Sequence, residues 1–321
     1  MPEIITDTAL AREALNKGQL VAIPTETVYG LAGNALSENA VNSIFAAKGR
    51  PAFNPLIVHV SGIDAVGEIA QGIPATATLL AKTFWPGPLT LVLDKKAGVP
   101  MATTGGLTTV AVRVPDHRLT LSLLEKLDYP LAAPSANPSG RTSPTCAVHV
   151  KDYFDTEFPY ILDGGRCRSG VESTIIGFDK GQAVLYRHGA IPAEAISSVT
   201  GRLMVNYPEK KEKNPCAPGM LSRHYATTKP LLLSGDPLAL ATYLAPKKAG
   251  ILFFRDSVQK NVCAVSRTLS PSGSLSEACH NLYAFLHELD RQPVDLIIAE
   301  EIPYRGLGTT INDRLRRAAK K

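Results

Sequence analysis

NPLIVHV, residues 54–60, is a strand sequence, and apolar runs of the same kind recur along the first two thirds of the chain. Successive side chains of a strand point to opposite faces, which puts Leu56, Val58 and Val60 on one face and His59 on the other. The three aliphatic side chains need a core to cover them, whereas a histidine is an uncommon residue on a buried strand. The segment therefore predicts a buried strand that carries one polar side chain.

Amphipathic helical patterns separate these apolar runs in the first two hundred residues. One helix is predicted at 39–48 with Gly49 as its stop, and another is predicted to begin at Pro144 with Ser143 as its cap. This alternation indicates an α/β domain built on a twisted sheet, and it argues against a helical bundle or a β-sandwich. Strands are predicted at 20–23, 55–60, 89–93, 110–114, 131–133, 172–178 and 183–187.

The pattern lapses between residues 202 and 228, where prolines and a run of charges are typical of a linker. A second alternation of strands and helices follows it. A chain of 321 residues suits two domains, at roughly 100–200 residues each. We therefore expect an α/β domain in residues 1–201, a linker in 202–228 and a smaller three-layer α/β domain in 229–321. The strands of the smaller domain are predicted at 231–233, 250–254, 262–265 and 296–299.

The composition argues against several classes of protein. No apolar run approaches the ~18–20 residues that cross a bilayer, and the N-terminal segment has no apolar signal core, so we expect a cytoplasmic protein without membrane contact. Five cysteines lack CxxC or Cys/His spacing, which favours free thiols over disulfides or a zinc site. The net charge of +5 comes mostly from the C-terminal part of the chain. That excess is a weak signal for RNA binding.

Several predicted strands and helices end on polar side chains. Arg113 shares a strand face with Ala111 in TVAVRVP, and a buried arginine is costly unless it has an anionic partner. Lys48 and Arg50 lie on either side of a helix end, where they can converge on one polyanion. Ligands of open α/β sheets bind at such strand ends. Neither GxxxxGK[ST] nor a GxGxxG after a strand is present, so a nucleotide would be held in another way.

Each of these residues also has a purely structural interpretation. A lone strand histidine such as His59 is usually a hydrogen-bonded core residue. Arg113 could pair with a structural carboxylate, and Lys48 is favoured by the dipole of its helix. Ser135 and Asn137 could form turns beside the prolines that flank them. The number of such residues within one domain is what favours a binding site.

Motifs with these residues occur in a fixed order between residues 20 and 190: PTETVYGL (24–31), KGRP (48–51), NPLIVHV (54–60), WPGPLT (85–90), TVAVRVP (109–115), APSAN (133–137) and GVEST (170–174). Together they resemble the YrdC-type threonylcarbamoyl-adenylate synthases. APGMLSRHY (217–225) and GLGTTINDRLRRAA (306–319) are similar to the linker and C-terminal domain of the long, two-domain form of that family. The resemblance implies a YrdC-like twisted open mixed sheet flanked by helices, followed by a linker and a smaller Rossmann-like α/β domain.

The resemblance also implies a reaction and a set of site residues. It implies an L-threonylcarbamoyladenylate synthase, a nucleotidyltransferase that makes threonylcarbamoyl-AMP and pyrophosphate from L-threonine, bicarbonate or CO₂, and ATP. The product would pass to a downstream tRNA threonylcarbamoyl transferase for tRNA modification. Threonine would be held by Thr27, His59, Arg113, Ser135 and Ser173. ATP would be held by Lys48, Arg50, Asn54, Thr109, Asn137, Thr145, Arg187 and Tyr225, with Lys48 and Arg50 as the catalytic residues.

The implied reaction brings an anionic carbamate against a polyphosphate that carries roughly four negative charges. We expect Lys48, Arg50 and Arg187 to offset this repulsion, with Mg²⁺ held mainly through the phosphates. Because the carbamate decomposes in water, the linker is expected to close over the cleft as a lid, with Gly219 giving mobility and Tyr225 covering the nucleotide.

Two other functions remain open from the sequence. The first is a non-catalytic module that binds double-stranded RNA, which the nearly balanced charge of residues 1–228 and the absence of interleaved aromatic residues argue against. The second is a carbamoyl transferase that uses carbamoyl phosphate. Exchange of substrates in one assay separates both from the synthase.

Overall fold

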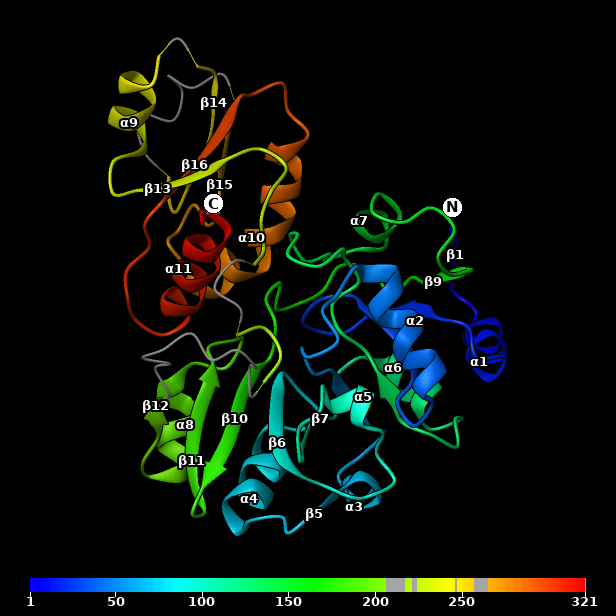
Figure 1. The fold of residues 1–321 in the computed structure, drawn as a ribbon. Helices are drawn as coiled ribbons and strands as arrows, with labels where there is room; N and C mark the ends of the chain where they lie inside the picture. The colour runs from blue at the N-terminus through cyan, green and yellow to red at the C-terminus, as the bar shows by residue number, and fades with distance from the viewer. Residues whose placement is uncertain (206–216, 221–223, 246, 257–264, 321) are drawn as a thin grey trace.

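The computed structural model describes residues 1–205, 217–220, 224–245, 247–256 and 265–320. They form a large sheet and a small sheet, each flanked by helices, and this two-domain α/β architecture confirms the predicted fold class (Figure 1). In the first part of the chain the elements are β1 (Glu3–Ile5), α1 (Thr8–Asn16), β2 (Val21–Ile23), β3 (Gly30–Asn34), α2 (Glu38–Lys48), β4 (Ile57–His59), α3 (Val66–Ile69), β5 (Ala70–Gln71), α4 (Ala75–Phe84), β6 (Leu89–Lys95), α5 (Met101–Thr104), β7 (Thr109–Arg113), α6 (Arg118–Leu124), β8 (Leu131–Ala132), α7 (Ala147–Lys151), β9 (Tyr160–Leu162), β10 (Thr174–Asp179), β11 (Gln182–Arg187), α8 (Ala193–Thr200) and β12 (Met204–Val205).

The large sheet is mixed, and its order brings one end of five strands together. The order is β1-β9-β2-β3-β8-β4-β7-β6-β10-β11-β12, and β5 pairs with β6 beside this path. Strands β4 and β7 are parallel and end together, because His59 is the register partner of Arg113. Strand β6 is antiparallel to β7, and β10 is parallel to β6 but antiparallel to β11. The starts of β6 and β10 therefore lie at the same end of the strands as the ends of β4, β7 and β11.

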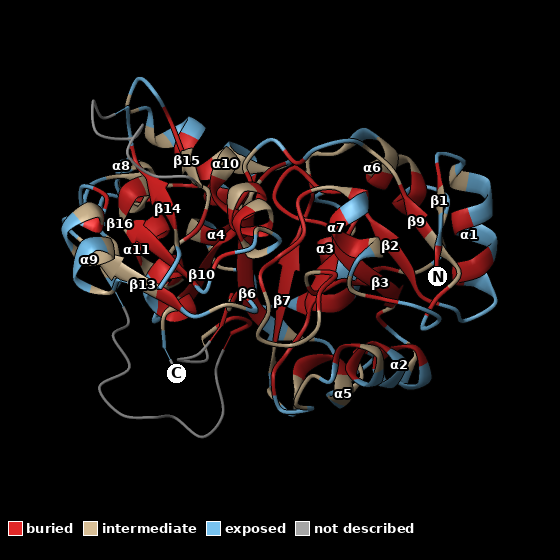
Figure 2. Ribbon diagram, turned by 90° about the horizontal axis from the view of Figure 1, so that it is seen from above, coloured by how far each residue is buried: buried red, intermediate tan, exposed pale blue. Residues whose placement is uncertain are grey.

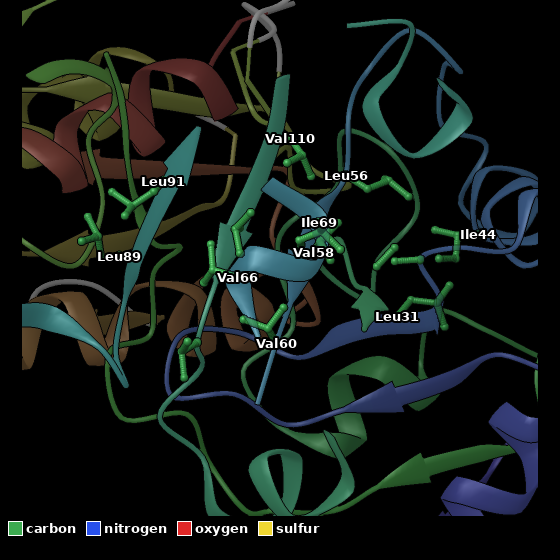
Figure 3. Packing of buried hydrophobic residues seen from close by; sticks show 14 of the residues in the cluster. Leu31, Ile44, Leu56, Val58, Val60, Val66, Ile69, Leu89, Leu91 and Val110 are labelled. Carbon is green, nitrogen blue, oxygen red and sulfur yellow. The ribbon is translucent and has the colours of Figure 1, made fainter. Parts of the chain in front are cut away.

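Strand alternation separates the main core from the opposite face of the sheet. Leu56, Val58 and Val60 belong to the main hydrophobic cluster, on one face of β4 as the sequence predicted, and the same cluster includes Ile44 of α2 and Val66 of α3 (Figure 3). Ile57 points the other way, into a separate cluster that the linker residue Ala217 helps to cover. The central strands are buried on both faces (Figure 2). The opposite face is therefore covered in two ways: helices α1 and α6 of the first domain pack on β2, β3, β8 and β9, and the linker residue Ala217 packs beside β4, β6, β7 and β10.

The seven strands predicted in the first domain appear within two residues of their predicted ends, and Gly49 ends α2 in a left-handed conformation as predicted. The helix predicted to begin at Pro144 is wrong, since α7 begins after Cys146. The Ser143 hydroxyl is used elsewhere, because it donates a hydrogen bond to Glu172. Strand β3 was not predicted, since its sequence GLAGN has two glycines and no β-branched residue.

The small sheet is entirely parallel, with the order β13-β16-β14-β15. The crossover through α9 and the crossover through α10 run in opposite directions along this order. Right-handed crossovers in opposite directions place their helices on opposite faces, which gives the predicted three-layer, Rossmann-like arrangement. The elements are β13 (Leu231–Ser234), α9 (Pro237–Tyr243), β14 (Ala249–Phe253), β15 (Ser266–Thr268), α10 (Leu275–Asp290), β16 (Leu296–Glu300) and α11 (Leu307–Ala318).

Some predictions for the second half of the chain meet the limits of the described residues. Residues 262–264 of the predicted strand 262–265 lie outside them, and β15 begins at Ser266. Most of the predicted linker, residues 206–216 and 221–223, also lies outside them. The short strand β12 falls inside the predicted linker and pairs with β11 at the edge of the large sheet. Among the described helices, none has the length and apolar character needed to cross a membrane.

The two domains share a hydrophobic cluster through helices α10 and α11. Val28 and Val171 from the first domain lie in the same cluster as Leu282 of α10 and Leu315 of α11. These two helices lie on the side of the small domain that faces the large one (Figure 1). Tyr225, from the linker, belongs to this cluster as well. The end of the large sheet where these five strands begin or end is thus covered jointly by the linker and the C-terminal domain.

Candidate functional site

A cavity lies at this end of the five strands, with about 560 Å³ of empty space including its mouth. Its walls come from the ends of β4, β7 and β11, from the loops after β2 and β8, and from the described part of the linker. The residues predicted for threonine, namely Thr27, His59, Arg113, Ser135 and Ser173, all line it. Of the residues predicted for ATP, Arg50, Arg187 and Tyr225 line it too.

His59 and Arg113 form one wall of the cavity. They are neighbours on the same face of the sheet, since they are register partners of two parallel strands. Burial, together with the charge of Arg113, lowers the pKa of His59 to about 3, so its imidazole is neutral at physiological pH. Its Nδ1 atom is buried, and no group in the described residues forms a hydrogen bond with it. A neutral ring with an unused nitrogen can bind a polar group of a ligand.

Arg113 is paired with a carboxylate as well as exposed to the cavity. Its Nη2 lies 2.7 Å from Oε2 of Glu26, and its Nε donates to the carbonyl oxygen of Gly87 at 3.3 Å. The structural interpretation of Arg113 is therefore correct in part, because Glu26 supplies the carboxylate that it needs. Glu26 lies in the motif PTETVYGL but was not predicted as a site residue. Its pairing with Arg113 could not be read from the sequence.

Hydroxyl groups form two pairs at the cavity, where Thr25, Thr27 and Ser173 line it. Thr25 and Thr27 join their Oγ1 atoms at 2.8 Å, and the Thr25 hydroxyl donates to the carbonyl oxygen of Val28 at 2.6 Å. Ser173 and Thr90 join their hydroxyl oxygens at 2.7 Å. Thr25 and Thr90 were not predicted as site residues, although both lie in motifs that the sequence analysis singled out. Each supports the orientation of a predicted hydroxyl.

The partly buried Arg50 and the buried Arg187 add two more positive charges to the cavity. Arg50 donates to the carbonyl oxygens of Asn54 and Pro55, at 3.1 and 2.8 Å. Burial, reinforced by the charge of Arg187, lowers the pKa of Arg50 to about 9. Buried charges of the same sign are costly unless an anion joins them. The cavity is therefore built to receive a polyanion.

Lys48 lies behind the cavity wall. Its Nζ donates to the carbonyl oxygens of Ser135 and Asn137, and burial followed by the charge of Arg50 holds its pKa well below 10.5. The ammonium group thus holds the loop that carries Ser135. The structure brings Arg50, Arg113 and Arg187 together in one cavity, with Lys48 as a support of its wall.

Four other predicted residues do not line the cavity. Asn54 and Asn137 are buried nearby. The Oδ1 atom of each has no hydrogen-bond partner among the described residues. The hydroxyl and amide groups of Thr145 lie 3.3–3.4 Å from Nδ1 of His149. Thr109 begins β7 opposite Asp94, and Arg113 ends the same strand, so Thr109 lies at the far end from the cavity.

The described linker residues close one side of the cavity. Pro218, Gly219, His224 and Tyr225 line it. Gly219, predicted to give the linker mobility, has a φ of +77°, and a Cβ there would lie 2.8 Å from Nη1 of Arg187. Gly219 therefore permits a close approach to Arg187. Tyr225 is buried, with φ of +67°, a conformation uncommon for a residue other than glycine.

Glu172 beside the cavity was also missed by the sequence analysis, together with its partners Tyr283 and Arg314. Tyr283 lies on α10 and Arg314 on α11, and both contact the Glu172 carboxylate. Glu172 and Arg314 both occur in quoted motifs, GVEST and GLGTTINDRLRRAA. These motifs are more than a hundred residues apart, and nothing in a single sequence shows that they meet.

Comparison with known proteins gives consistent matches over nearly the whole chain. The Sua5/YciO/YrdC family model, described as telomere recombination, matches residues 13–189, and the model of the threonylcarbamoyl-AMP synthase C-terminal domain matches residues 191–320. A threonylcarbamoyl-AMP synthase of Pyrococcus abyssi is 42% identical over 97% of this chain and 93% of its own length. One of Bacillus subtilis is 39% identical over 99% of this chain and 93% of its own length. The crystal structure of P. abyssi Sua5 complexed with L-threonine is similar with a TM-score of 0.91 and 40% identity, over 99% of this chain and 97% of that one.

Proposed function

Since the chain belongs to the threonylcarbamoyl-AMP synthase family, we propose that the cavity is where L-threonine, bicarbonate or CO₂, and ATP are joined into threonylcarbamoyl-AMP. The observation that carries this assignment is the gathering of Arg50, Arg113 and Arg187 in one cavity, at the end of the five central strands. Three guanidinium groups gathered in one cavity suit a reaction between a carboxylate-bearing amino acid and a nucleoside triphosphate.

The threonine is proposed to lie against β4 and β7. Arg113 is positioned to bind its carboxylate, and the Thr25–Thr27 pair offers hydroxyl groups for its side chain. The neutral imidazole of His59 adds no positive charge near the threonine amine. This matters because the amine must lose a proton before it forms a bond to the carbon of CO₂. The P. abyssi relative was crystallised with L-threonine, which supports an amino acid as the ligand of this fold.

The triphosphate is proposed to lie toward Arg50 and Arg187. One carbamate oxygen attacks the α-phosphorus, the bond from that phosphorus to the bridging oxygen breaks, and pyrophosphate leaves with the bonding electrons. Charge accumulates on the phosphoryl oxygens, and fixed guanidinium groups stabilise it without reorganisation. Tyr225 and His224 cover the same part of the cavity and exclude water from it.

Magnesium would enter with the nucleotide. The described residues contain no group of three or more His, Cys, Asp or Glu that could hold a metal ion. The two carboxylates at the cavity, Glu26 and Glu172, are each paired with an arginine. This donor set fits an ion held mainly by phosphate oxygens and water, which would neutralise part of the phosphate charge. We propose that four other residues predicted for ATP support the wall of the cavity, namely Lys48, Asn54, Asn137 and Thr145. Thr109 lies at the far end of β7 and is not proposed to contact the nucleotide.

The test is pyrophosphate release from ATP with threonine and bicarbonate omitted in turn, followed by detection of the acyl adenylate. Both omissions should abolish release. Arg50→Met should lower kcat about 10²–10³-fold, whereas Arg202→Met, at an exposed position, should leave it unchanged. Release that continues without threonine would contradict the proposal, and turnover with carbamoyl phosphate would favour a carbamoyl transferase. Steeply salt-dependent RNA binding without turnover would favour the RNA-binding module.

The domain division and the later fate of the product complete the proposal. We assign catalysis to residues 1–201, cover of the site to the linker 202–228, and a supporting role to residues 229–321. Because an acyl adenylate hydrolyses in water, the product would pass quickly to a transferase that modifies tRNA. Mixing the purified protein with such a transferase and tRNA, and measuring threonylcarbamoyl transfer, tests that step.

A further inference from the structure

GVEST, residues 170–174, is the segment where the C-terminal domain meets the cavity. Gly170 has φ of +70°, and a Cβ there would lie 2.5–2.6 Å from carbonyl oxygens of α10. Val171 is fully buried in the cluster shared with α10 and α11. Ser173 lines the cavity. Within this segment, contact with the C-terminal domain changes to contact with the cavity at Glu172, which takes part in both.

Glu172 is held by three groups, two of them from the C-terminal domain. Its Oε1 accepts a hydrogen bond from the Ser143 hydroxyl at 2.7 Å, and the Tyr283 hydroxyl lies 3.0 and 2.9 Å from its two oxygens. Nε of Arg314 donates to its Oε2 at 2.8 Å. Although burial alone would raise it, the charges of Arg314 and Arg187 hold the pKa of Glu172 at about 2. The carboxylate is therefore ionised and well satisfied.

Arg314 holds the chain on both sides of the Ser173–Arg187 contact. It binds Glu172, the residue before Ser173, and its Nη2 donates to the carbonyl oxygen of His188, the residue after Arg187, at 2.7 Å. Between these two points Arg187 donates to Ser173, through Nε and Nη2 to the carbonyl oxygen at 3.2 and 2.8 Å and through Nη2 to the hydroxyl at 3.0 Å. One guanidinium thus fixes the backbone that carries both residues.

Arg314 and Tyr283 also hold Tyr225 in its uncommon conformation. The guanidinium carbon of Arg314 lies 4.8 Å from the centroid of the Tyr225 ring, and the Tyr283 ring stacks on the same ring at 5.8 Å. A tyrosine with positive φ persists only where its surroundings require it. Neither Arg314 nor Tyr283 lines the cavity itself. Of the residues that they contact, Glu172 and Tyr225 line it, and Glu172 and His188 are chain neighbours of the lining residues Ser173 and Arg187.

We propose that Arg314 and Tyr283 are positioning residues of the active site, which act through Glu172, His188 and Tyr225 to fix Ser173 and Arg187 against the substrates. This inference rests on the proposed function of the cavity. It gives the C-terminal domain a defined task, because α10 and α11 support residues that line the cavity or adjoin its lining. Misplacement of a charge-stabilising group by about 1 Å can cost on the order of 100-fold in rate.

The test compares Arg314→Met and Arg314→Lys with Arg316→Met in the full-length protein. Arg316 lies on the same helix, but its side chain is mostly exposed. Arg314→Met should lower kcat/KM for ATP roughly 10–100-fold. Arg316→Met should behave as wild type. Lysine keeps the charge beside Glu172 but cannot bind Glu172 and His188 together, so Arg314→Lys should recover the Tm and remain about 10-fold slow.

The pattern of results separates positioning from plain stability. If Arg314→Lys recovers both Tm and kcat/KM, or if Arg314→Met changes Tm alone, the positioning role is overturned. Should Arg314→Met fail to fold, Tyr283→Phe decides, since it deletes one hydroxyl and keeps the ring on Tyr225. It should lower kcat/KM about 3–10-fold, and unchanged kinetics would overturn the proposal. If wild-type protein shows no threonine-dependent pyrophosphate release, the proposed function fails instead, and ATP affinity measured by calorimetry then tests whether Arg314 still orders the cavity.

Discussion

Replacement of Arg113 by methionine should have two separable effects, one on stability and one on threonine binding. In the structure Arg113 and Glu26 are both buried and lie 2.7 Å apart. Removal of Arg113 leaves Glu26 as an unpaired buried charge, which costs about 3–5 kcal/mol of unfolding free energy. The threonine carboxylate loses its charged hydrogen bonds at the same time. Those are worth about 1.5–3 kcal/mol, or roughly 10–150-fold in affinity.

The double variant Arg113→Met/Glu26→Gln distinguishes these effects. Removing the charge of Glu26 should restore most of the lost stability in urea unfolding, because no charge remains unpaired. Threonine affinity, measured by calorimetry, should stay as low as in Arg113→Met. The single variant Glu26→Gln should bind threonine at least as tightly as wild type, since Arg113 then has no competing carboxylate. Recovery of threonine affinity in the double variant would refute the assignment of Arg113 to the substrate.

Further predictions follow from backbone geometry and from the interface between the domains. Gly219→Ala places a Cβ 2.8 Å from the Arg187 guanidinium. It should therefore raise KM for ATP about 10-fold in the pyrophosphate assay. An unchanged KM would show that the linker does not approach that arginine. Gly170→Ala should lower unfolding stability by more than about 1 kcal/mol in urea titrations, because its Cβ would collide with backbone of α10. Burial lowers the pKa of His149 to about 3 and that of His287, stacked on it at 4.0 Å, to about 4. As the pH falls below 6.5, these histidines take up protons in the unfolded chain before they do so in the folded protein. The free energy of unfolding should therefore fall by about 1.4 kcal/mol per histidine for each pH unit between 6.5 and 4. In urea titrations at stepped pH, His287→Gln should make this dependence on pH less steep.

The sequence predicted seven strands of the first domain, β2, β4, β6, β7, β8, β10 and β11, because each is a short apolar run. Alternation also placed His59 correctly on the face opposite Leu56 and Val58. Strand β3 was missed because a strand buried among close neighbours can be built from glycine and alanine, and packing then replaces propensity. Its Gly33 is an example, since a Cβ there would lie 2.9 Å from Leu20.

The sequence predicted many residues of the candidate site, but it did not predict which side chains contact one another. Strand ends carrying polar side chains were visible in the sequence, yet the pairing of Arg113 with Glu26 depends on how loops close across the sheet. The contact of Glu172 with Arg314 depends on the docking of two domains, which single-sequence periodicity does not encode. Thr109 shows the opposite error, because its motif is right but its position on β7 lies at the end away from the cavity.

The register that aligns His59 with Arg113 also limits how the gene for this protein can change in length. Insertions in the loops beyond these strands leave the pair in place, so evolution or a protein engineer can vary those loops. A single inserted residue inside β4, by contrast, would rotate every side chain after it by half a turn. The imidazole would then enter the aliphatic interior, and a valine would face the guanidinium.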